Sequence, residues 1–369
     1  MMFAENRTIS LRQLQVLLLL DCFGTAVLFL PAELAQMSGR ACWMAAFIGG
    51  VAFVLFSLLL TAVGQKYPEG TVVEWCRSAF GSLLGTIILV GLGAKLLFDG
   101  VLELRIFSEI VCRAMLPSTP VWAISLVILA VAGALAAQGT ECRGRTAEVL
   151  FFVVAIPLVV ILAAVAISSR YGRILPLDLP DFSEMKDGIF AMSMVFQGLT
   201  FLFFIFPDLE KPQKARKAVF ISSLATAAVI AVILFLCLAV YGENVLSEKL
   251  MPTLQMMERV SFTGVFLTRQ DVLLLWFWMA SVTVFLSGTL FYGSLLGVRL
   301  FRQQEKYRKK WLLGCIGVVF VASFLPENLS AAHSLRVTFA PWFHLVYLFF
   351  LPLVLLFLMT RGGKAHAEK

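Results

Sequence analysis

Long apolar runs separated by short polar loops make up almost the whole chain. Most of these runs are long enough for an α-helix to cross the hydrocarbon core of a membrane, which takes about 20 residues. A membrane β-strand would alternate apolar and polar positions over about ten residues, and the runs do not follow that pattern. The sequence therefore predicts an all-α integral membrane protein with about ten transmembrane helices, near residues 11–37, 41–64, 82–112, 120–137, 145–168, 188–207, 217–241, 271–299, 311–325 and 341–360.

The first and sixth runs are each interrupted by small residues near their middle. The first run contains Gly24, Thr25 and Ala26, and the sixth contains Gln197, Gly198 and Leu199. An interrupted helix leaves backbone N–H and C=O groups that hydrocarbon cannot satisfy, so such interruptions persist where they line a cavity or bind something. These six residues are therefore candidates for binding a small molecule. A lone glycine that lets two helices pack closely is the alternative at either position.

The two interruptions also indicate how the chain is organised. Gly24 lies about 14 residues, or roughly 20 Å, into its run, and Gly198 lies about 10 residues, or roughly 15 Å, into its own. Both therefore fall near the membrane midplane, in runs that cross in opposite directions. This predicts a 5+5 inverted repeat with broken first and sixth helices. We expect one transmembrane domain over residues 1–369, with repeats at about 10–168 and 187–360 and a cytoplasmic tail at 361–369.

The basic residues are distributed unevenly between the two sides of the membrane. Nineteen Lys and Arg residues fall in the segments on the side of the N-terminus, and nine fall on the other side. Loops that remain in the cytoplasm carry the excess of Lys and Arg, so this bias predicts that both termini are cytoplasmic. It also accounts for the net charge of +7 without a nucleic-acid partner.

The composition fits this class and argues against catalysis. With 60% hydrophobic and 14% charged residues, the chain has too little polar surface for a soluble globule. The seven cysteines are scattered without a CxxC pair, and the three histidines have no ligand spacing. We therefore expect no metal, no cofactor and no catalytic residues.

The third run carries five ionisable residues, Lys95, Asp99, Glu103, Arg105 and Glu109. Charged groups within a membrane are costly unless they are paired or face water. At 100° per residue the five fall on an arc of about 160°, so one side of this helix is polar. Two pairs have the i,i+4 spacing that joins opposite charges, and Glu103 has no partner at that spacing.

This polar side has two interpretations. In the first, the charges form ion pairs that neutralise one another inside the helix bundle. In the second, Lys95, Asp99 and Glu103 form a hydrated path for ions, protons or water.

The eighth run supplies two further candidates for ligand contact. Thr289 and Tyr292 are three residues apart on one face and lie beside Gly288. Hydroxyl groups in membrane helices often bond to their own backbone, which is the alternative for this run.

Several short motifs, taken in order, resemble a known family. They are Ile9-Ser10-x-x-Gln13, the Gly24-Thr25 break followed by Pro31, Pro117-Ser118-Thr119-Pro120, Gly139-x-Glu141-x-x-x-Arg145-x-x-Glu148, Met251-Pro252-Thr253-Leu254, and Arg269-x-Asp271. Their order and placement resemble the B subunit of spore germinant receptors, the endospore germination permeases of the amino acid–polyamine–organocation superfamily. The resemblance covers nearly the whole chain. It implies the ten-helix inverted-repeat fold, the inner membrane of a dormant spore, and nutrient sensing with an A subunit and a lipoprotein C subunit.

An amino acid is the ligand that this resemblance implies, and the candidate residues can be given roles toward it. Its carboxylate would meet the N–H groups of Gly24, Thr25 and Ala26, because the N-terminus of a half-helix carries partial positive charge. The carbonyl groups of Gln197, Gly198 and Leu199 would accept from its ammonium group. Leu199, Thr289 and Tyr292 would contact its side chain. The alternatives are a proton- or sodium-coupled amino-acid permease and a water or ion conduit along the third helix.

Overall fold

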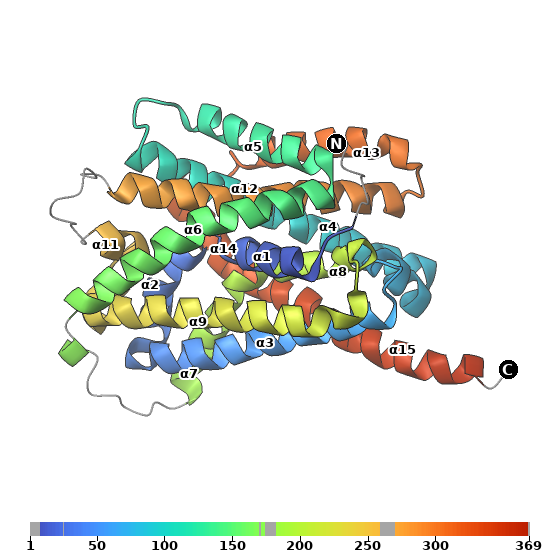
Figure 1. Cartoon of the computed structure of the whole chain (residues 1–369), viewed down its shortest axis with the longest axis horizontal. Coiled ribbons are helices and arrows are strands. Elements are labelled where there is room, and N and C mark those ends of the chain that lie inside the picture. The colour runs from blue at the N-terminus through green and yellow to red at the C-terminus, as the bar shows by residue number, and fades with distance from the viewer. Residues whose placement is uncertain (1–7, 25, 170, 174–181, 259–269, 368–369) are drawn as a thin grey trace.

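The computed structural model describes residues 8–24, 26–169, 171–173, 182–258 and 270–367, and these residues form a bundle of helices (Figure 1). The α-helices are α1 (Leu11–Cys22), α2 (Ala26–Ser38), α3 (Cys42–Lys66), α4 (Val72–Ala114), α5 (Val121–Gln138), α6 (Thr140–Ser168), α7 (Phe182–Ala191), α8 (Leu202–Ile205), α9 (Ala215–Tyr241), α10 (Glu243–Ser247), α11 (Pro252–Glu258), α12 (Gln270–Leu300), α13 (Arg308–Ala322), α14 (Leu329–His344) and α15 (Leu351–Ala367). A 3-10 helix, η3 (Met192–Phe201), joins α7 to α8, and a π-helix, η7 (Leu345–Phe350), joins α14 to α15.

The all-α membrane class predicted from the sequence is confirmed, and the number of spans differs slightly. Within the described ranges, eight helical segments are long and apolar enough to cross a membrane, and the bent pair of α1 and α2 makes a ninth. The run at 311–325 forms α13, whose 15 residues fall short of the roughly 20 that a full crossing needs. The last span begins earlier than expected, at Leu329, and its helix continues through the expected tail to Ala367.

The start of α1 is fixed by the first of the sequence motifs. The backbone N–H of Gln13 donates to Ser10 Oγ at 3.2 Å, and that of Ser10 donates to Gln13 Oε1 at 2.9 Å. These reciprocal bonds form a capping box, which satisfies two N–H groups at the helix end. Ile9 in turn donates to the Asp208 carbonyl at 2.7 Å. The motif therefore starts a membrane helix and attaches it to the end of the sixth span.

The break after α1 is closed by side chains of α12. Ser281 Oγ donates to the Leu20 carbonyl at 2.5 Å and to the Phe23 carbonyl at 2.8 Å, and Trp278 Nε1 donates to the Gly24 carbonyl at 3.1 Å. The Leu20 and Gly24 carbonyls also accept from the backbone N–H groups of Phe23 and Val27, at 3.2 and 3.3 Å. These side-chain bonds add to the few backbone bonds that remain at a helix end, where carbonyls need partners inside a membrane. α2 then leaves the break at 55° to α1.

A second backbone gap lies within α2. Pro31 has no N–H, so the carbonyl of Val27, four residues earlier, loses its helical partner. Thr253 of α11 donates its hydroxyl to this carbonyl at 2.8 Å. Thr253 of the Met251-Pro252-Thr253 motif therefore replaces the hydrogen-bond donor that α2 lacks at Pro31.

The interruption in the sixth span takes a different form from the one expected. Met192–Phe201 is wound as ten residues of 3-10 helix, and all ten are buried. A 3-10 helix keeps i→i+3 hydrogen bonds, so this backbone is tightened rather than opened. Runs of 3-10 helix longer than three or four residues are uncommon, which marks this segment as unusual.

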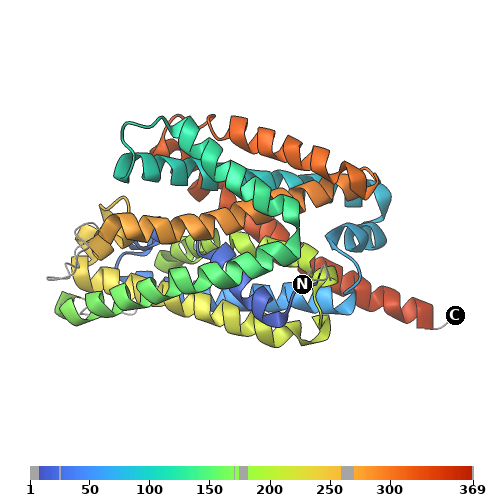
Figure 2. The same cartoon turned by 45° about the horizontal axis from the view of Figure 1, so that its top comes forward.

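The two interrupted spans lie in the interior of the bundle. α1 packs against α6, α9, α12 and η3, while α4 packs against α12 and α3 against α9. Figures 1 and 2 show α5, α12 and α13 on one side of the molecule and α3 and α9 on the other, with α1 between them. Both views also show the end of α15 projecting beyond the other helices. The inverted repeat stays a prediction.

Replacing Thr253 with Val should destabilise the protein, because the Val27 carbonyl would be left buried without a donor. We expect the free energy of unfolding to fall by about 1–3 kcal/mol. Pro31→Ala restores a backbone N–H at this position, so Thr253→Val should cost much less in that background. Thermal melting of the detergent-purified single and double variants measures this coupling, and equal costs in both backgrounds would contradict it.

Candidate functional site

The two interruptions predicted from the sequence meet in the structure. A Cβ atom added at Gly198 would lie 2.6 Å from the carbonyl carbon of Asp21, so only a glycine allows this contact between η3 and α1. A Cβ atom at Gly24 would lie 2.6 Å from Gln197 Nε2 and 2.8 Å from Glu103 Oε1. The candidates from the two spans therefore share one buried region. Ala26, Gln197 and Leu199 are buried there, and Thr25 lies outside the described residues.

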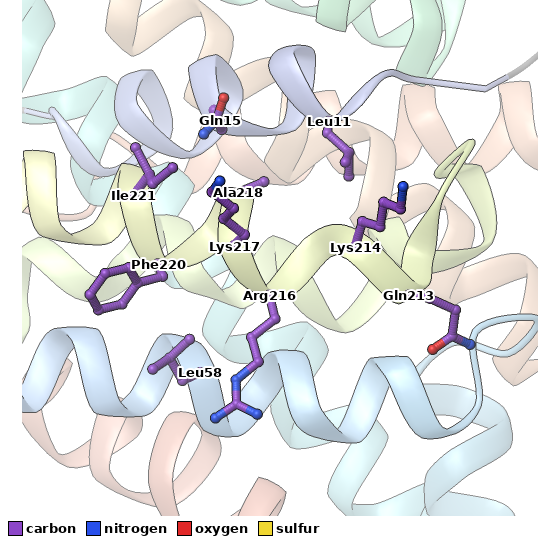
Figure 3. Close-up of a pocket in the computed structure, with 10 residues that line it drawn as sticks. All are labelled: Leu11, Gln15, Leu58, Gln213, Lys214, Arg216, Lys217, Ala218, Phe220 and Ile221. Atoms are coloured by element: carbon purple, nitrogen blue, oxygen red, sulfur yellow. The ribbon is translucent and has the colours of Figure 1, made fainter.

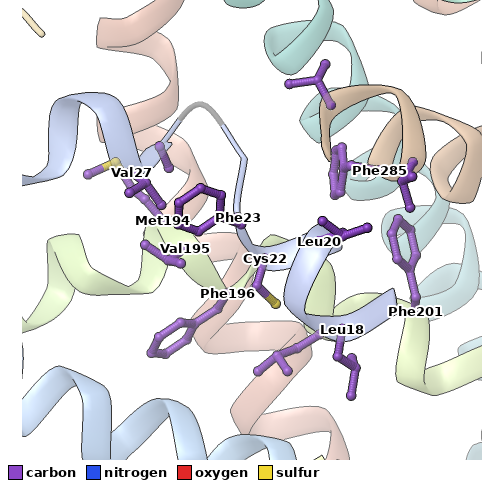
Figure 4. Packing of buried hydrophobic residues seen from close by; sticks show 14 of the residues in the cluster. Leu18, Leu20, Cys22, Phe23, Val27, Met194, Val195, Phe196, Phe201 and Phe285 are labelled. Atoms are coloured by element: carbon purple, nitrogen blue, oxygen red, sulfur yellow. The ribbon is translucent and has the colours of Figure 1, made fainter. Parts of the chain in front are cut away.

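Apolar side chains surround this contact. Figure 4 shows Phe23 and Cys22 of the first span beside Met194, Val195 and Phe196 of the sixth. The ring of Phe23 also stacks on that of Trp278, with 4.9 Å between the ring centroids. The region is therefore largely apolar, and Gln197 and Glu103 contribute polar side chains to it.

The charged residues of the third span form the ion pairs that their spacing indicated. Lys95 Nζ lies 2.7 Å from Asp99 Oδ2 and also donates to the hydroxyl of Thr200 in η3. Arg105 lies 2.9 Å from Glu109. Lys95 and Asp99 are buried, so α4 carries a neutralised pair beside the sixth span.

Glu103 has a partner that the sequence analysis missed. Its Oε2 lies 2.8 Å from Arg336 Nη2 of α14 and accepts from Gln197 Nε2 at 3.2 Å. We expected Arg336 in an outer loop, because the last span was predicted to begin near residue 341. α14 instead starts at Leu329, so Arg336 enters the bundle and is buried.

A second buried pair joins Asp21 to Arg143 at 2.5 Å. Arg143 also donates to the Val284 carbonyl at 3.3 Å, and its guanidinium lies 4.9 Å from the ring centroid of Phe201. The predicted span bounds leave Arg143 in the short loop between the runs at 120–137 and 145–168, and the sequence analysis gave Asp21 no role. A single carboxylate next to a helix break inside a membrane requires a cation as its partner. The position of Asp21 in the sequence could therefore have indicated a buried basic residue such as Arg143.

The two candidates of α12 face different neighbours. Thr289 packs against α4, where a Cβ atom at Gly100 would lie 2.8 Å from its methyl group. Tyr292 packs against Phe201 and Phe204, each with a centroid distance of 5.3 Å, and lies beside Arg143. Thr289 therefore lies against Gly100, the residue that follows Asp99 in α4, and Tyr292 lies next to Arg143 of the Asp21–Arg143 pair.

α14 contributes two histidines to the same interior. His333 lies 2.6 Å from Glu33 of α2 and stacks on Phe29, and His344 lies 4.0 Å from Asp99. In the part of the chain that the structure describes, no group of three or more His, Cys, Asp and Glu residues has the geometry to hold a metal ion.

Comparison with known proteins gives a consistent result. Residues 8–332 match the protein family described as spore germination protein. Three proteins of Bacillus subtilis (strain 168) are similar over most or all of their length. Spore germination protein YndE is 24% identical over the whole of both chains, spore germination protein KB is 23% identical over 99% of this chain and 98% of its own, and spore germination protein B2 is 22% identical over 88% and 89%.

Neutralising one partner of the Glu103–Arg336 pair should be far more harmful than neutralising both. Glu103→Gln or Arg336→Gln removes one charge of a buried ion pair, which costs about 3–5 kcal/mol. The double variant should recover much of that loss in membrane abundance and melting temperature. Arg113→Gln is the control, because this half-exposed side chain pairs at 3.4 Å with Glu109 and should contribute about 1 kcal/mol or less. Additive losses in the double variant would show that the two charges are not coupled.

Proposed function

The chain belongs to the spore germination protein family, and on that premise we propose that it is a transporter-like, nutrient-sensing subunit of a spore germinant receptor. The observation that carries the proposal is the contact between the two interrupted spans at Gly24 and Gly198, deep in the bundle. Interrupted helices that meet inside a membrane bundle commonly form the substrate site of transporter folds.

The ligand we propose is an amino acid or a similar small zwitterion. Its carboxylate would bind the N–H groups around Gly24, Thr25 and Ala26, and its ammonium group the carbonyls around Gln197, Gly198 and Leu199. Thr289 and Tyr292 would contribute to selectivity from α12. Glu103 and Arg336, joined beside Gly24, supply the two charges that a zwitterion would engage.

Binding at this place would be coupled to a conformational change. Gln197 and Glu103 fill the space next to Gly24, so a ligand enters only when they move. A ligand shifts a conformational equilibrium by the difference in its affinity for the two states. Displacing Gln197 and Glu103 therefore converts nutrient binding into a signal without any catalysis.

We further propose that the protein resides in the spore inner membrane with both termini in the cytoplasm and acts with A and C subunits. In support, α1 begins beside Asp208, and Arg77 bonds to the Leu300 carbonyl. The first bond attaches the start of α1 to the segment 208–217, and the second attaches the start of α4 to the segment 299–310. The positive-inside bias assigns both of these basic segments to the cytoplasm.

The alternatives differ in what crosses the membrane. A proton- or sodium-coupled amino-acid permease would use the same region in a transport cycle. A water or ion conduit along α4 is less well supported, because Lys95 and Asp99 pair with each other and Glu103 with Arg336.

Replacing Gly24 or Gly198 with Val tests the site directly. The added atoms collide with Gln197 and Glu103 in the first variant and with the α1 backbone in the second. We expect the nutrient concentration for half-maximal germination to rise by about tenfold or more, which corresponds to about 1.4 kcal/mol. Gly317→Val is the matched control, because a Cβ atom at this position in α13 meets nothing within 4 Å. Membrane abundance is measured in parallel, and an unchanged response from both site variants would remove the breaks from the proposal.

Deleting the A or the C subunit separates receptor from permease. Partners that bind only the folded state stabilise it, so this chain should become less abundant in the spore membrane when either is absent. The nutrient response should be lost at the same time. Undiminished abundance in both deletion strains, together with amino-acid uptake by the purified chain in liposomes, would favour the permease.

A further inference from the structure

A groove on the outside of the bundle lies apart from the proposed nutrient site. It has a volume of about 770 Å³ and lies where the start of α9 meets α1 and α3 (Figure 3). This volume is in the range of small-molecule sites, roughly 300–1,000 Å³. The groove lies at the end of the bundle where α1 begins. The basic segment 211–217 lies at this same end.

Three cations line the groove. Lys214, Arg216 and Lys217 are all exposed, and within the described residues none of them takes part in an ion pair. Figure 3 shows Lys217 directed toward α1 and Arg216 toward α3, so the charges lie on both flanks of α9. The described lining contains no carboxylate, and Gln15 and Gln213 are its other polar side chains. The groove is therefore suited to an anion.

The rest of the lining is apolar. Leu11, Leu58, Phe220 and Ile221 contribute to it, and the last two are 42% and 45% exposed. The exposed apolar face of α9 continues through Leu224, Val232 and Phe235. From Ile221 to Phe235 the face extends roughly 20 Å at 1.5 Å per residue, about two-thirds of the hydrocarbon core. A ligand of this groove thus meets cations at one end and a long apolar track at the other.

We propose that this groove binds one anionic glycerophospholipid. The headgroup phosphate would lie among Lys214, Arg216 and Lys217, and the acyl chains would follow Phe220, Ile221 and the outer face of α9. A free phosphate would satisfy the cations and leave the apolar part unused, whereas a lipid matches both. Basic pockets between membrane helices on the cytoplasmic side are suited to acidic headgroups.

The bound lipid would act on the helix that leads to the break. Leu11 and Gln15 lie in the first two turns of α1, and Leu58 lies on α3. A lipid in contact with all three helices would fasten α1 to α3 and α9. This inference is independent of the identity of the nutrient and of the proposed site at Gly24.

Native mass spectrometry of the purified full chain tests the proposal, with palmitoyl-oleoyl phosphatidylglycerol as the probe. Replacing Lys214, Arg216 and Lys217 together with Gln should weaken its binding by about tenfold or more. Replacing Lys306, Lys309 and Lys310 with Gln is the matched control, because it removes the same charge from another exposed basic segment and should change binding by about twofold or less. Melting temperatures without lipid confirm that both triple variants fold.

A second arm tests the apolar part of the groove. Phe220→Ser combined with Ile221→Ser should weaken phosphatidylglycerol binding while all three cations remain. If the two triple variants lost phosphatidylglycerol affinity equally, the effect would be one of general surface charge, and the proposal would be overturned. So would phosphatidylcholine binding as tightly as phosphatidylglycerol, or inorganic phosphate displacing the lipid at equal concentration.

Discussion

Hydrocarbon offers no partner to a free carbonyl or a charge, and this constraint explains much of the interior of the bundle. The carbonyls freed where α1 ends are bonded by Ser281 and Trp278, and the one freed by Pro31 is bonded by Thr253. In each case the break lies in the first span and the donor lies more than 200 residues later. The interrupted first span is therefore tied to α11 and α12, and a shift of α12 would break the bonds that Ser281 and Trp278 make to it.

α14 meets the same constraint with polar side chains. Arg336 forms an ion pair with Glu103 of α4, a ring nitrogen of His333 lies 2.6 Å from Glu33 of α2, and His344 lies 4.0 Å from Asp99 of α4. One helix therefore contacts carboxylates on both α2 and α4. Moving α14 relative to α4 would require these contacts to be exchanged together. This helix is thus well placed to distinguish two states of the bundle.

The sequence predicts the features that depend on neighbouring positions. The break in the first span and the i,i+4 pair of Lys95 and Asp99 follow from local spacing, and the structure contains them. The Asp21–Arg143 and Glu103–Arg336 pairs join residues 122 and 233 positions apart, for which one sequence offers no periodic signal. Arg143 and Arg336 also resemble loop residues, because a charge at the end of an apolar run looks the same whether it faces water or a buried carboxylate. The 3-10 winding of η3 was equally hidden, since its residues give no pattern that separates it from α-helix.

The long separation between Glu103 and Arg336 has a consequence for biogenesis. A ribosome that adds roughly 5–20 residues per second needs on the order of 10–50 s to make the 233 positions between them. Arg143, the partner of Asp21, is synthesised much earlier, within the first half of the chain. During this interval Glu103 lies in a helix that is made before its partner Arg336 has been synthesised. The ion pair that joins α4 to α14 can therefore form only after almost the whole chain has been made, and it is one of the last contacts to complete the bundle.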